Sequence, residues 1–237
     1  SSQSPSPSVD PALYEGMRYR MVGPFRGGRV TAVAGFPDDL HAYIHGASGG
    51  GIWQTDDVGQ HWRPTADDAL TAGSIGAVAV AEGNPGVIYV GSGSACIRGN
   101  VSVGRGMWRS ADRGGTWAFV GLPASGAIGE IVVRPDDEDV VYAAALGNPF
   151  GPNPERGVYR SRDGGENWDN VLFLNDSTGA VALAMNPDNP NEIFAGMWRA
   201  ERKPWTLISG GEDGGIYRTR DGGDTWTKLS GGLPEGV

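Results

Sequence analysis

Two carboxylates, Glu130 and Asp176, stand out in this sequence as candidates for chemistry. Glu130 follows the glycine that opens an apolar run, and Asp176 lies just before another such run. Two carboxylic acids about 5 to 10 Å apart can act as acid and base in glycoside hydrolysis. One such pair also arises easily among the 28 acidic residues of the chain, so a purely structural role is the competing interpretation.

Arginine and aromatic residues gather in three longer segments, 92–105, 145–156 and 196–214. The segments carry Arg98, Arg105, Arg156, Arg199, Arg202 and Lys203, with Phe150, Trp198 and Trp205 between them. Arginine forks bind carboxylates and aromatic rings anchor interfaces, which favours a docking surface for an acidic or aromatic group of a partner. In the alternative interpretation these cations pair with Glu155, Glu201, Glu212 and Asp213 and only hold the segments in place.

Four copies of one twelve-residue stretch organise the chain: 51–62, 106–117, 157–168 and 215–226. Each reads Gly, apolar, Trp or Tyr, Gln or Arg, Ser or Thr, any, Asp, any, Gly, any, any, Trp. The apolar and aromatic start indicates a strand, Asp and Gly favour a tight turn, and Trp starts the return strand. A structural role in these turns is therefore predicted for Asp57, Trp62, Asp112, Trp117, Asp163, Trp168, Asp221 and Trp226.

Two further strands precede each copy, which gives four short strands per repeat of about 50 residues. This pattern predicts an all-β protein made of four four-stranded antiparallel β-propeller blades, at about 28–70, 74–123, 127–175 and 177–233. Residues 1–13 are expected to form a Ser/Pro-rich tether, and 14–27 a lead-in strand that could close a last blade. The propeller is expected to be incomplete or completed by a partner. The three long segments then share one rim, opposite the Asp turns.

Two residues near the expected axis add to the candidate binding residues. Arg29 is predicted to occupy the same position in its repeat as Glu130, where the other repeats have Ala77 and Ala180. His45 is predicted to occupy the position that Gly91, Ala144 and Gly196 hold in the other repeats. Both side chains could line the mouth of the channel.

Composition excludes several classes of function. The net charge of -9 argues against nucleic-acid binding, and no apolar run is long enough to span a membrane. The single cysteine, Cys96, has no partner at metal-ligand spacing, so we expect neither metal nor cofactor. The first residues, Ser-Ser-Gln-Ser-Pro-Ser-Pro-Ser, are typical of a spacer after a secretion signal or beside a lipid anchor.

The repeated stretch resembles the Asp-box, or BNR repeat, of sialidases, xyloglucan-active glycoside hydrolases and sortilin-type ectodomains. Gly-Pro-Phe-Arg-Gly-Gly-Arg-Val (23–30), Ala-Ser-Gly-Gly-Gly-Ile-Trp (47–53), Arg-Gly-Val-Tyr-Arg-Ser (156–161) and Ser-Gly-Gly (209–211) are most similar to the large bacterial sortilin/VPS10-like proteins. Those proteins are often labelled glycosyl hydrolases and are usually much longer. The resemblance implies a propeller and the N-terminal portion of a longer chain. A sialidase would need an Arg-Ile-Pro signature, which residues 25–30 lack.

These observations leave two hypotheses from different classes. The first is a non-catalytic binding module that is secreted or periplasmic in a bacterium, either free or lipid-anchored, and that docks on another protein as an accessory subunit of a membrane-associated complex. The second is a glycoside hydrolase that uses Glu130 and Asp176 on a polysaccharide at the axial cleft.

Overall fold

The computed structural model describes residues 10–17, 28–99 and 101–231. Residues 1–9 of the predicted tether and residues 18–27 of the predicted lead-in strand lie outside the described residues. Only residues 10–17 of these two segments are described. In that short stretch Pro11–Tyr14 forms the 3₁₀ helix η1, and the Asp10 carboxylate accepts a hydrogen bond from the amide of Ala12 at 3.0 Å.

The prediction of an all-β structure made of four-stranded antiparallel blades is confirmed. Blade 1 contains β1 (Val30–Phe36), β2 (Asp39–Ala47), β3 (Gly51–Thr55) and β4 (Arg63–Pro64). Blade 2 contains β5 (Ile75–Val80), β6 (Ile88–Ser92), β7 (Met107–Ser110) and β8 (Ala118–Phe119). Blade 3 contains β9 (Ile128–Arg134), β10 (Asp137–Ala145), β11 (Gly157–Ser161) and β12 (Asp169–Leu172). Blade 4 contains β13 (Thr178–Asn186), β14 (Asn189–Arg202), β16 (Gly215–Thr219) and β17 (Thr227–Lys228), with β15 (Leu207–Ser209) paired to β14.

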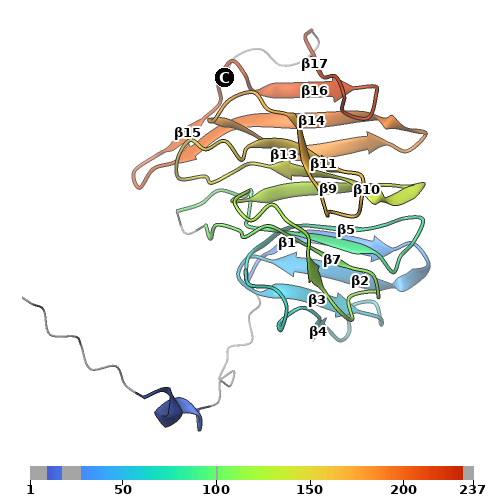
Figure 1. Cartoon of the computed structure of the whole chain (residues 1–237), viewed down its shortest axis with the longest axis vertical. Coiled ribbons are helices and arrows are strands. Elements are labelled where there is room, and N and C mark those ends of the chain that lie inside the picture. The colour runs from blue at the N-terminus through green and yellow to red at the C-terminus, as the bar shows by residue number, and fades with distance from the viewer. Residues whose placement is uncertain (1–9, 18–27, 100, 232–237) are drawn as a thin grey trace, which may run out of the picture.

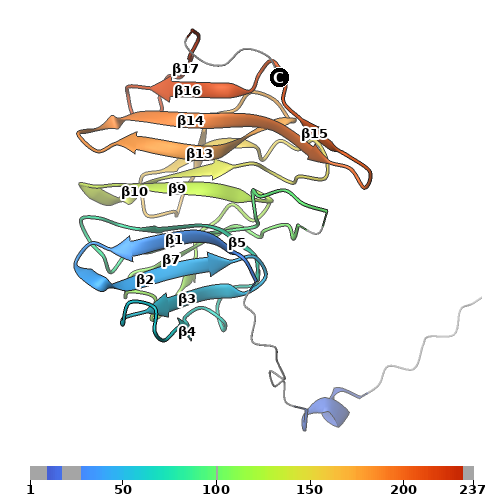
Figure 2. The same ribbon diagram turned by 180° about the vertical axis from the view of Figure 1, so that it is seen from behind.

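The four blades lie in an open row (Figures 1 and 2). The first strand of each blade contacts the first strand of the next, so β1 meets β5, β5 meets β9 and β9 meets β13. We call the blade face toward the preceding blade its leading face and the opposite one its trailing face. In this row the leading face of blade 1 and the trailing face of blade 4 have no neighbouring blade among the described residues.

Apolar side chains fill the three junctions between blades. Each junction joins residues from one trailing face to residues from the next leading face. Between blades 1 and 2, Ile44 and Ile52 pack against Val78 and Val90. Between blades 2 and 3, Tyr89 and Met107 pack against Ile131 and Ala143. Between blades 3 and 4, Tyr142 and Val158 pack against Leu183 and Ala195. Burying a large apolar side chain contributes about 1.5 to 3 kcal/mol, so these junctions are the main source of stability.

The Asp-box turns are closed by a repeated hydrogen-bond network, which blade 2 illustrates. The Asp112 carboxylate accepts bonds from the amide and hydroxyl of Thr116, both at 2.7 Å, and from the hydroxyl of Ser110 at 2.8 Å. The Ser110 hydroxyl oxygen in turn accepts from the amide of Gly114 at 2.8 Å. The bonds from Thr116 and Ser110 lower the pKa of Asp112 to about 2. The carboxylate is thus committed to the turn.

In blades 2, 3 and 4, the tryptophan that follows the turn contacts the preceding blade. The indole N–H of Trp117 donates to the carbonyl of Thr65 at 3.0 Å, and that of Trp168 donates to the carbonyl of Val120 at 2.7 Å. Trp226 bonds within its own blade, to the carbonyl of Gly223 at 3.2 Å, but packs in the cluster between blades 3 and 4. The Asp-box therefore acts at the junctions as well as in the turn.

The strand register corrects two predicted equivalences near the axis. The apolar second residue of the Asp-box stretch is Ile52, Met107, Val158 or Ile216. In the second strand of the same blade it pairs with Gly46, Gly91, Ala144 or Gly196, respectively. His45, one residue earlier, corresponds instead to Val90, Ala143 and Ala195, and so lies on the opposite sheet face.

The opening glycine of a repeat does not mark one fixed register position, which explains the other correction. The residues paired to those four positions are Ala32, Ala77, Glu130 and Ala182. Glu130 therefore matches Ala77 as predicted, but neither Arg29 nor Ala180 occupies this position. Gly28 lies four residues before Ala32 and Gly179 three before Ala182, whereas Gly76 and Gly129 directly precede Ala77 and Glu130.

The third long segment is also more regular than predicted. β14 continues through Arg202, and its last three residues pair with β15, Ala200 with Ser209 and Arg202 with Leu207. A hairpin therefore replaces the first part of the loop expected at 196–214.

We expect Val58→Gly to stabilise the protein by about 1 kcal/mol. Val58 has φ 62°, whereas the equivalent residues of blades 3 and 4, Gly164 and Gly222, adopt φ 72° and 70° without side-chain strain. Urea unfolding of the wild type and the variant measures the difference.

Two control variants make this test specific. Val58→Ala should gain little, because alanine is also strained at positive φ. Arg113→Gly removes the same kind of strain, at φ 61°, but also the ion pair with Asp38 at 2.8 Å and the contact over the Phe36 ring, so it should not stabilise. An equal gain from glycine and alanine at position 58 would contradict the backbone explanation.

Candidate functional site

The three long connections lie at one end of the sheets. They are 93–106 between β6 and β7, 146–156 between β10 and β11, and the β14–β15 hairpin with the residues up to 214. Figure 1 shows them on the side where β15 projects. We call residues 93–106, 146–156 and 199–214 the loop rim.

The arginines of the described residues divide between the two ends of the molecule. Toward the Asp-box turns, every arginine has a carboxylate within 4.0 Å. These are Arg63, Arg109, Arg113, Arg134, Arg160, Arg162, Arg218 and Arg220. Toward the loop rim, the described arginines are without such a partner. These are Arg29, Arg98, Arg105, Arg156, Arg199 and Arg202. Of the cations on the rim only Lys203 forms an ion pair, with Glu201.

Arg156 differs from the other rim arginines because its side chain is fully buried. Its Nη2 donates to the carbonyl oxygens of Asn148 at 3.0 Å, Gly151 at 3.2 Å and Ala200 at 3.1 Å. Burial lowers the pKa of Arg156. Arg156 therefore joins the 146–156 connection to β14, and we leave it out of the surface that a partner could reach.

Asp176 and Arg199 come together in a hollow of about 710 Å³ between blades 3 and 4. Glu212 and Asp213 line the same hollow, and the Asp213 carboxylate accepts a bond from the amide group of Asn175 at 2.9 Å. The hollow thus combines one unpaired guanidinium with three carboxylates. It can hold a polar group of mixed charge.

Arg29 and Arg98 line a second hollow, of about 320 Å³, together with Ser48 and Ser102. Both guanidinium groups are exposed. Two cations beside hydroxyl groups favour a carboxylate or another anion.

Exposed aromatic side chains accompany the rim cations. Trp205, beyond the end of β14, is 80% exposed, and Phe150 is 43% exposed. Arg202 follows Glu201 at the end of β14 and bonds through its backbone amide to the carbonyl of Pro149. Arg105 is exposed, and its backbone amide donates to the Ser92 hydroxyl at 2.7 Å. The exposed rings and cations of the rim can therefore contact an acidic, aromatic partner surface.

Glu130 lies on β9, whereas Asp176 precedes β13. Glu130 is half-buried, and burial raises the pKa of its carboxyl group. The hollow that Asp176 lines with Arg199 does not include Glu130. The two predicted carboxylates therefore have different surroundings.

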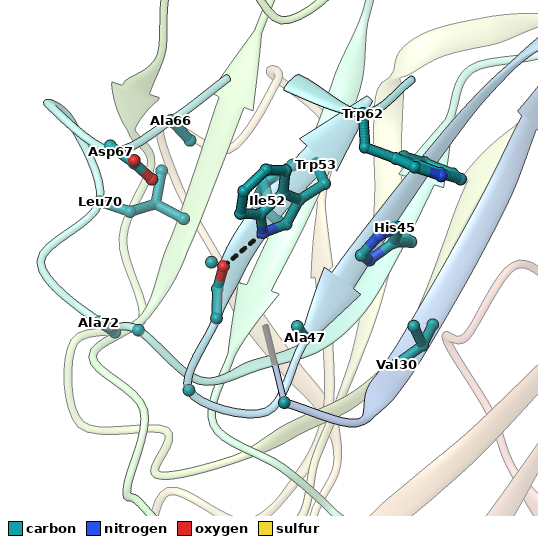
Figure 3. Close-up of a pocket in the computed structure, with 15 residues that line it drawn as sticks. Val30, His45, Ala47, Ile52, Trp53, Trp62, Ala66, Asp67, Leu70 and Ala72 are labelled. Atoms are coloured by element: carbon teal, nitrogen blue, oxygen red, sulfur yellow. Dashed lines mark hydrogen bonds between the residues drawn. The ribbon is translucent and has the colours of Figure 1, made fainter. Parts of the chain in front are cut away.

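His45 lies in a hollow of about 860 Å³ on the leading face of blade 1 (Figure 3). Its ring meets the Trp62 ring edge to face at 4.6 Å, and burial lowers its pKa. Sequence reasoning missed Trp53 and Asp67, which line the same hollow. Trp53 was interpreted only as a strand residue of the repeat, and nothing in the local sequence marks its face as uncovered.

Comparisons with known proteins place the chain in a family. The family described as "Sortilin-Vps10: Sortilin, neurotensin receptor 3" matches residues 105–234, more than half of the chain. The chain therefore belongs to the Sortilin-Vps10 family. No curated protein matches its sequence.

Several solved structures share the fold at low sequence identity. An ancestral GH74 enzyme matches with TM-score 0.67 and 22% identity over 90% of this chain and 25% of its own. The GH74 xyloglucanase of Xanthomonas campestris matches with TM-score 0.64 and 21% identity over 89% and 31%. The GH74 enzyme of Niastella koreensis gives TM-score 0.62 and 21% identity over 86% and 30%. This chain thus spans about a quarter to a third of those proteins, and the likeness shows the fold alone.

The described residues lack a metal-binding cluster and a membrane-spanning helix. No group of three or more His, Cys, Asp or Glu side chains there is arranged to hold a metal ion. Within the same ranges, no helix is both long enough and apolar enough to cross a membrane.

We expect Arg156→Met to lower the free energy of unfolding by about 2 to 4 kcal/mol, because three carbonyl groups lose a charged donor. Amide hydrogen exchange should accelerate in 146–156 and at the end of β14, and stay unchanged in blade 1. Arg199→Met is the matched control and should change stability by less than about 0.5 kcal/mol. Equal effects of the two substitutions would contradict the separate roles.

Glu130→Gln should raise the urea midpoint at pH 7. Folding raises the pKa of this carboxyl group, so the cost of ionising it appears as the pH rises above its unfolded value, about 4.3. The gain should therefore shrink as the pH falls through about 4.3 and vanish near about pH 3, where glutamate is protonated in both states. A loss of stability at pH 7 would show instead that the ionised carboxylate makes a favourable contact.

Proposed function

We propose that this protein is a non-catalytic binding module that docks through its loop rim on an acidic surface of another protein. The observation that carries the proposal is the division of the arginines. Those near the Asp-box turns are paired with carboxylates, whereas Arg98, Arg105, Arg199 and Arg202 on the rim are not.

The charge of the whole molecule opposes the binding of an acidic partner. A chain of net charge -9 repels acidic partners on average, so a surface that attracts them needs cations free of internal carboxylates. Exposed Trp205 and Phe150 add apolar area beside those cations. Arginine and tryptophan are the side chains most often dominant at protein interfaces.

The setting of this function is part of the proposal. The match to a family model described as sortilin and a receptor favours a protein outside the cytoplasm, as a secreted or periplasmic accessory subunit of a membrane-associated complex. The partner contact also extends to Arg29 in its hollow with Arg98.

The alternative is hydrolysis of a polysaccharide at the axial end of the blades, with Glu130 and Asp176 as the carboxylates. It is motivated by the fold shared with GH74 enzymes. The separate surroundings of the two side chains count against it. Xyloglucan, the substrate class named for one similar structure, is the polysaccharide to test first. Hydrolysis that Glu130→Gln abolishes would overturn the non-catalytic proposal.

We expect the double substitution Arg199→Gln/Arg202→Gln to weaken binding to an acidic aromatic probe by about tenfold or more. A fluorescent copolymer of glutamate and tyrosine serves as the probe, and fluorescence anisotropy measures the dissociation constant. Added salt should weaken wild-type binding as well.

The matched control is Arg162→Gln/Arg220→Gln near the Asp-box turns. Both side chains are well exposed and already close to carboxylates, so this variant should bind like the wild type. Equal losses in the two double variants would contradict a specific rim surface. Absence of wild-type binding at low salt would contradict the proposed partner chemistry.

A further inference from the structure

The hollow of about 710 Å³ lies between two blades that the structure describes, blades 3 and 4. Met197 packs in the cluster between these blades, and Arg199 follows two residues later on β14, on the same sheet face. Thr178 of β13 is paired with Arg199, and directly paired residues share one face of a sheet. Both side chains therefore lie on the leading face of blade 4, toward blade 3, which supplies Pro152 to the wall.

The charged groups of this hollow are not paired with one another. Among the described residues, Arg199 has no carboxylate within 4.0 Å. In the same part of the chain, no cation lies within 4.0 Å of the carboxylates of Asp176, Glu212 and Asp213. Opposite charges that line one hollow without pairing can both be satisfied by a ligand that carries both signs.

A buried hydroxyl group is an independent indication of a ligand. Thr178 lines the hollow and is 1% exposed, and its Oγ1 has no hydrogen-bond partner among the described residues. Leaving a buried polar group unpaired costs free energy, so such groups usually have a partner. A ligand carboxylate could accept hydrogen bonds from this hydroxyl and from the Arg199 guanidinium together.

The opposite, acidic side of the hollow is held in place before any ligand binds. The backbone amide of Asn153 donates to the carbonyl oxygen of Asp176 at 2.9 Å. The side-chain amide of Asn175 donates to the carboxylate of Asp213 at 2.9 Å, and the Tyr217 hydroxyl donates to the carbonyl oxygen of Asp213 at 3.0 Å. A ligand therefore meets a preformed site and loses little affinity to ordering it.

The charges of the hollow define the class of ligand. Three carboxylates against one guanidinium leave a formal surplus of two negative charges. A neutral zwitterion would leave that surplus uncompensated, and a simple dication would leave Arg199 and Thr178 without an acceptor. A ligand with one carboxylate and two ammonium groups satisfies both sides.

We propose that this hollow binds a free basic α-amino acid. Its carboxylate lies on Arg199 and Thr178, and its two ammonium groups lie toward the facing carboxylates. The volume is within the usual range of small-molecule pockets. The site does not depend on the docking proposal, although Arg199 takes part in both.

Isothermal titration calorimetry of the whole chain with L-lysine tests the proposal. We expect a dissociation constant below about 1 mM. Norleucine, lysinamide and Nα-acetyl-lysine each lack one of the three charged groups, and each should bind at least about tenfold more weakly. Absence of lysine binding up to about 10 mM would overturn the proposal. Equally tight binding of Nα-acetyl-lysine would also overturn it, because it would assign the hollow to the C-terminal lysine of another chain.

Variants of the chain locate the binding. Thr178→Val keeps the shape of the side chain and suits a strand, so it should fold, and it should weaken lysine binding about tenfold. Asp176→Asn/Asp213→Asn should weaken it at least as much. Asp188→Asn, at the exposed turn between β13 and β14, is the matched control and should bind lysine like the wild type.

The glutamate–tyrosine copolymer separates this site from the docking surface. Thr178→Val should bind the copolymer like the wild type, so loss of lysine binding and loss of docking are measured independently. Unchanged lysine binding in Thr178→Val, or an equal loss in Asp188→Asn, would contradict a site in this hollow.

Discussion

The structure depends on the contact that the Asp-boxes of blades 2, 3 and 4 make with the blade before them. The box first closes its own turn, through a carboxylate held by amide and hydroxyl donors. It then places a tryptophan whose indole reaches a carbonyl of the preceding blade, as Trp117 reaches Thr65. A single blade has two apolar faces and cannot bury either alone. The box therefore couples the folding of one repeat to the presence of its neighbour.

This coupling explains why the two ends of each blade serve different purposes. At the box end the side chains are occupied: Asp112 is bound by Thr116 and Ser110, and Arg160 reaches Asp224 of the next blade at 2.7 Å. At the loop rim the connections are not repeated and their exposed arginines keep their charge available. The repeated residues thus fix the architecture, and the unrepeated ones carry the proposed binding.

Much of this fold could be predicted from the sequence, because the Asp-box recurs with a fixed internal spacing. Comparison along the strands failed because residues that look alike do not keep one register position: His45 was matched with Gly91 instead of Val90, and Arg29 was equated with Glu130. The burial of Arg156 could not be predicted, because it depends on the carbonyls of Asn148 and Ala200 converging from separate elements. The hollow beside Trp53 was also missed, because it exists only where a repeated face lacks its neighbour.

Hydrogen exchange of the tryptophan indole N–H groups, followed by NMR, tests the central claim most directly. If the Asp-box tryptophans join consecutive blades, the indole protons of Trp117 and Trp168 should exchange far more slowly than that of Trp205, which is 80% exposed. Exchange of Trp117 and Trp168 as fast as that of Trp205 would show that these bonds do not hold the blades together, and would contradict the account.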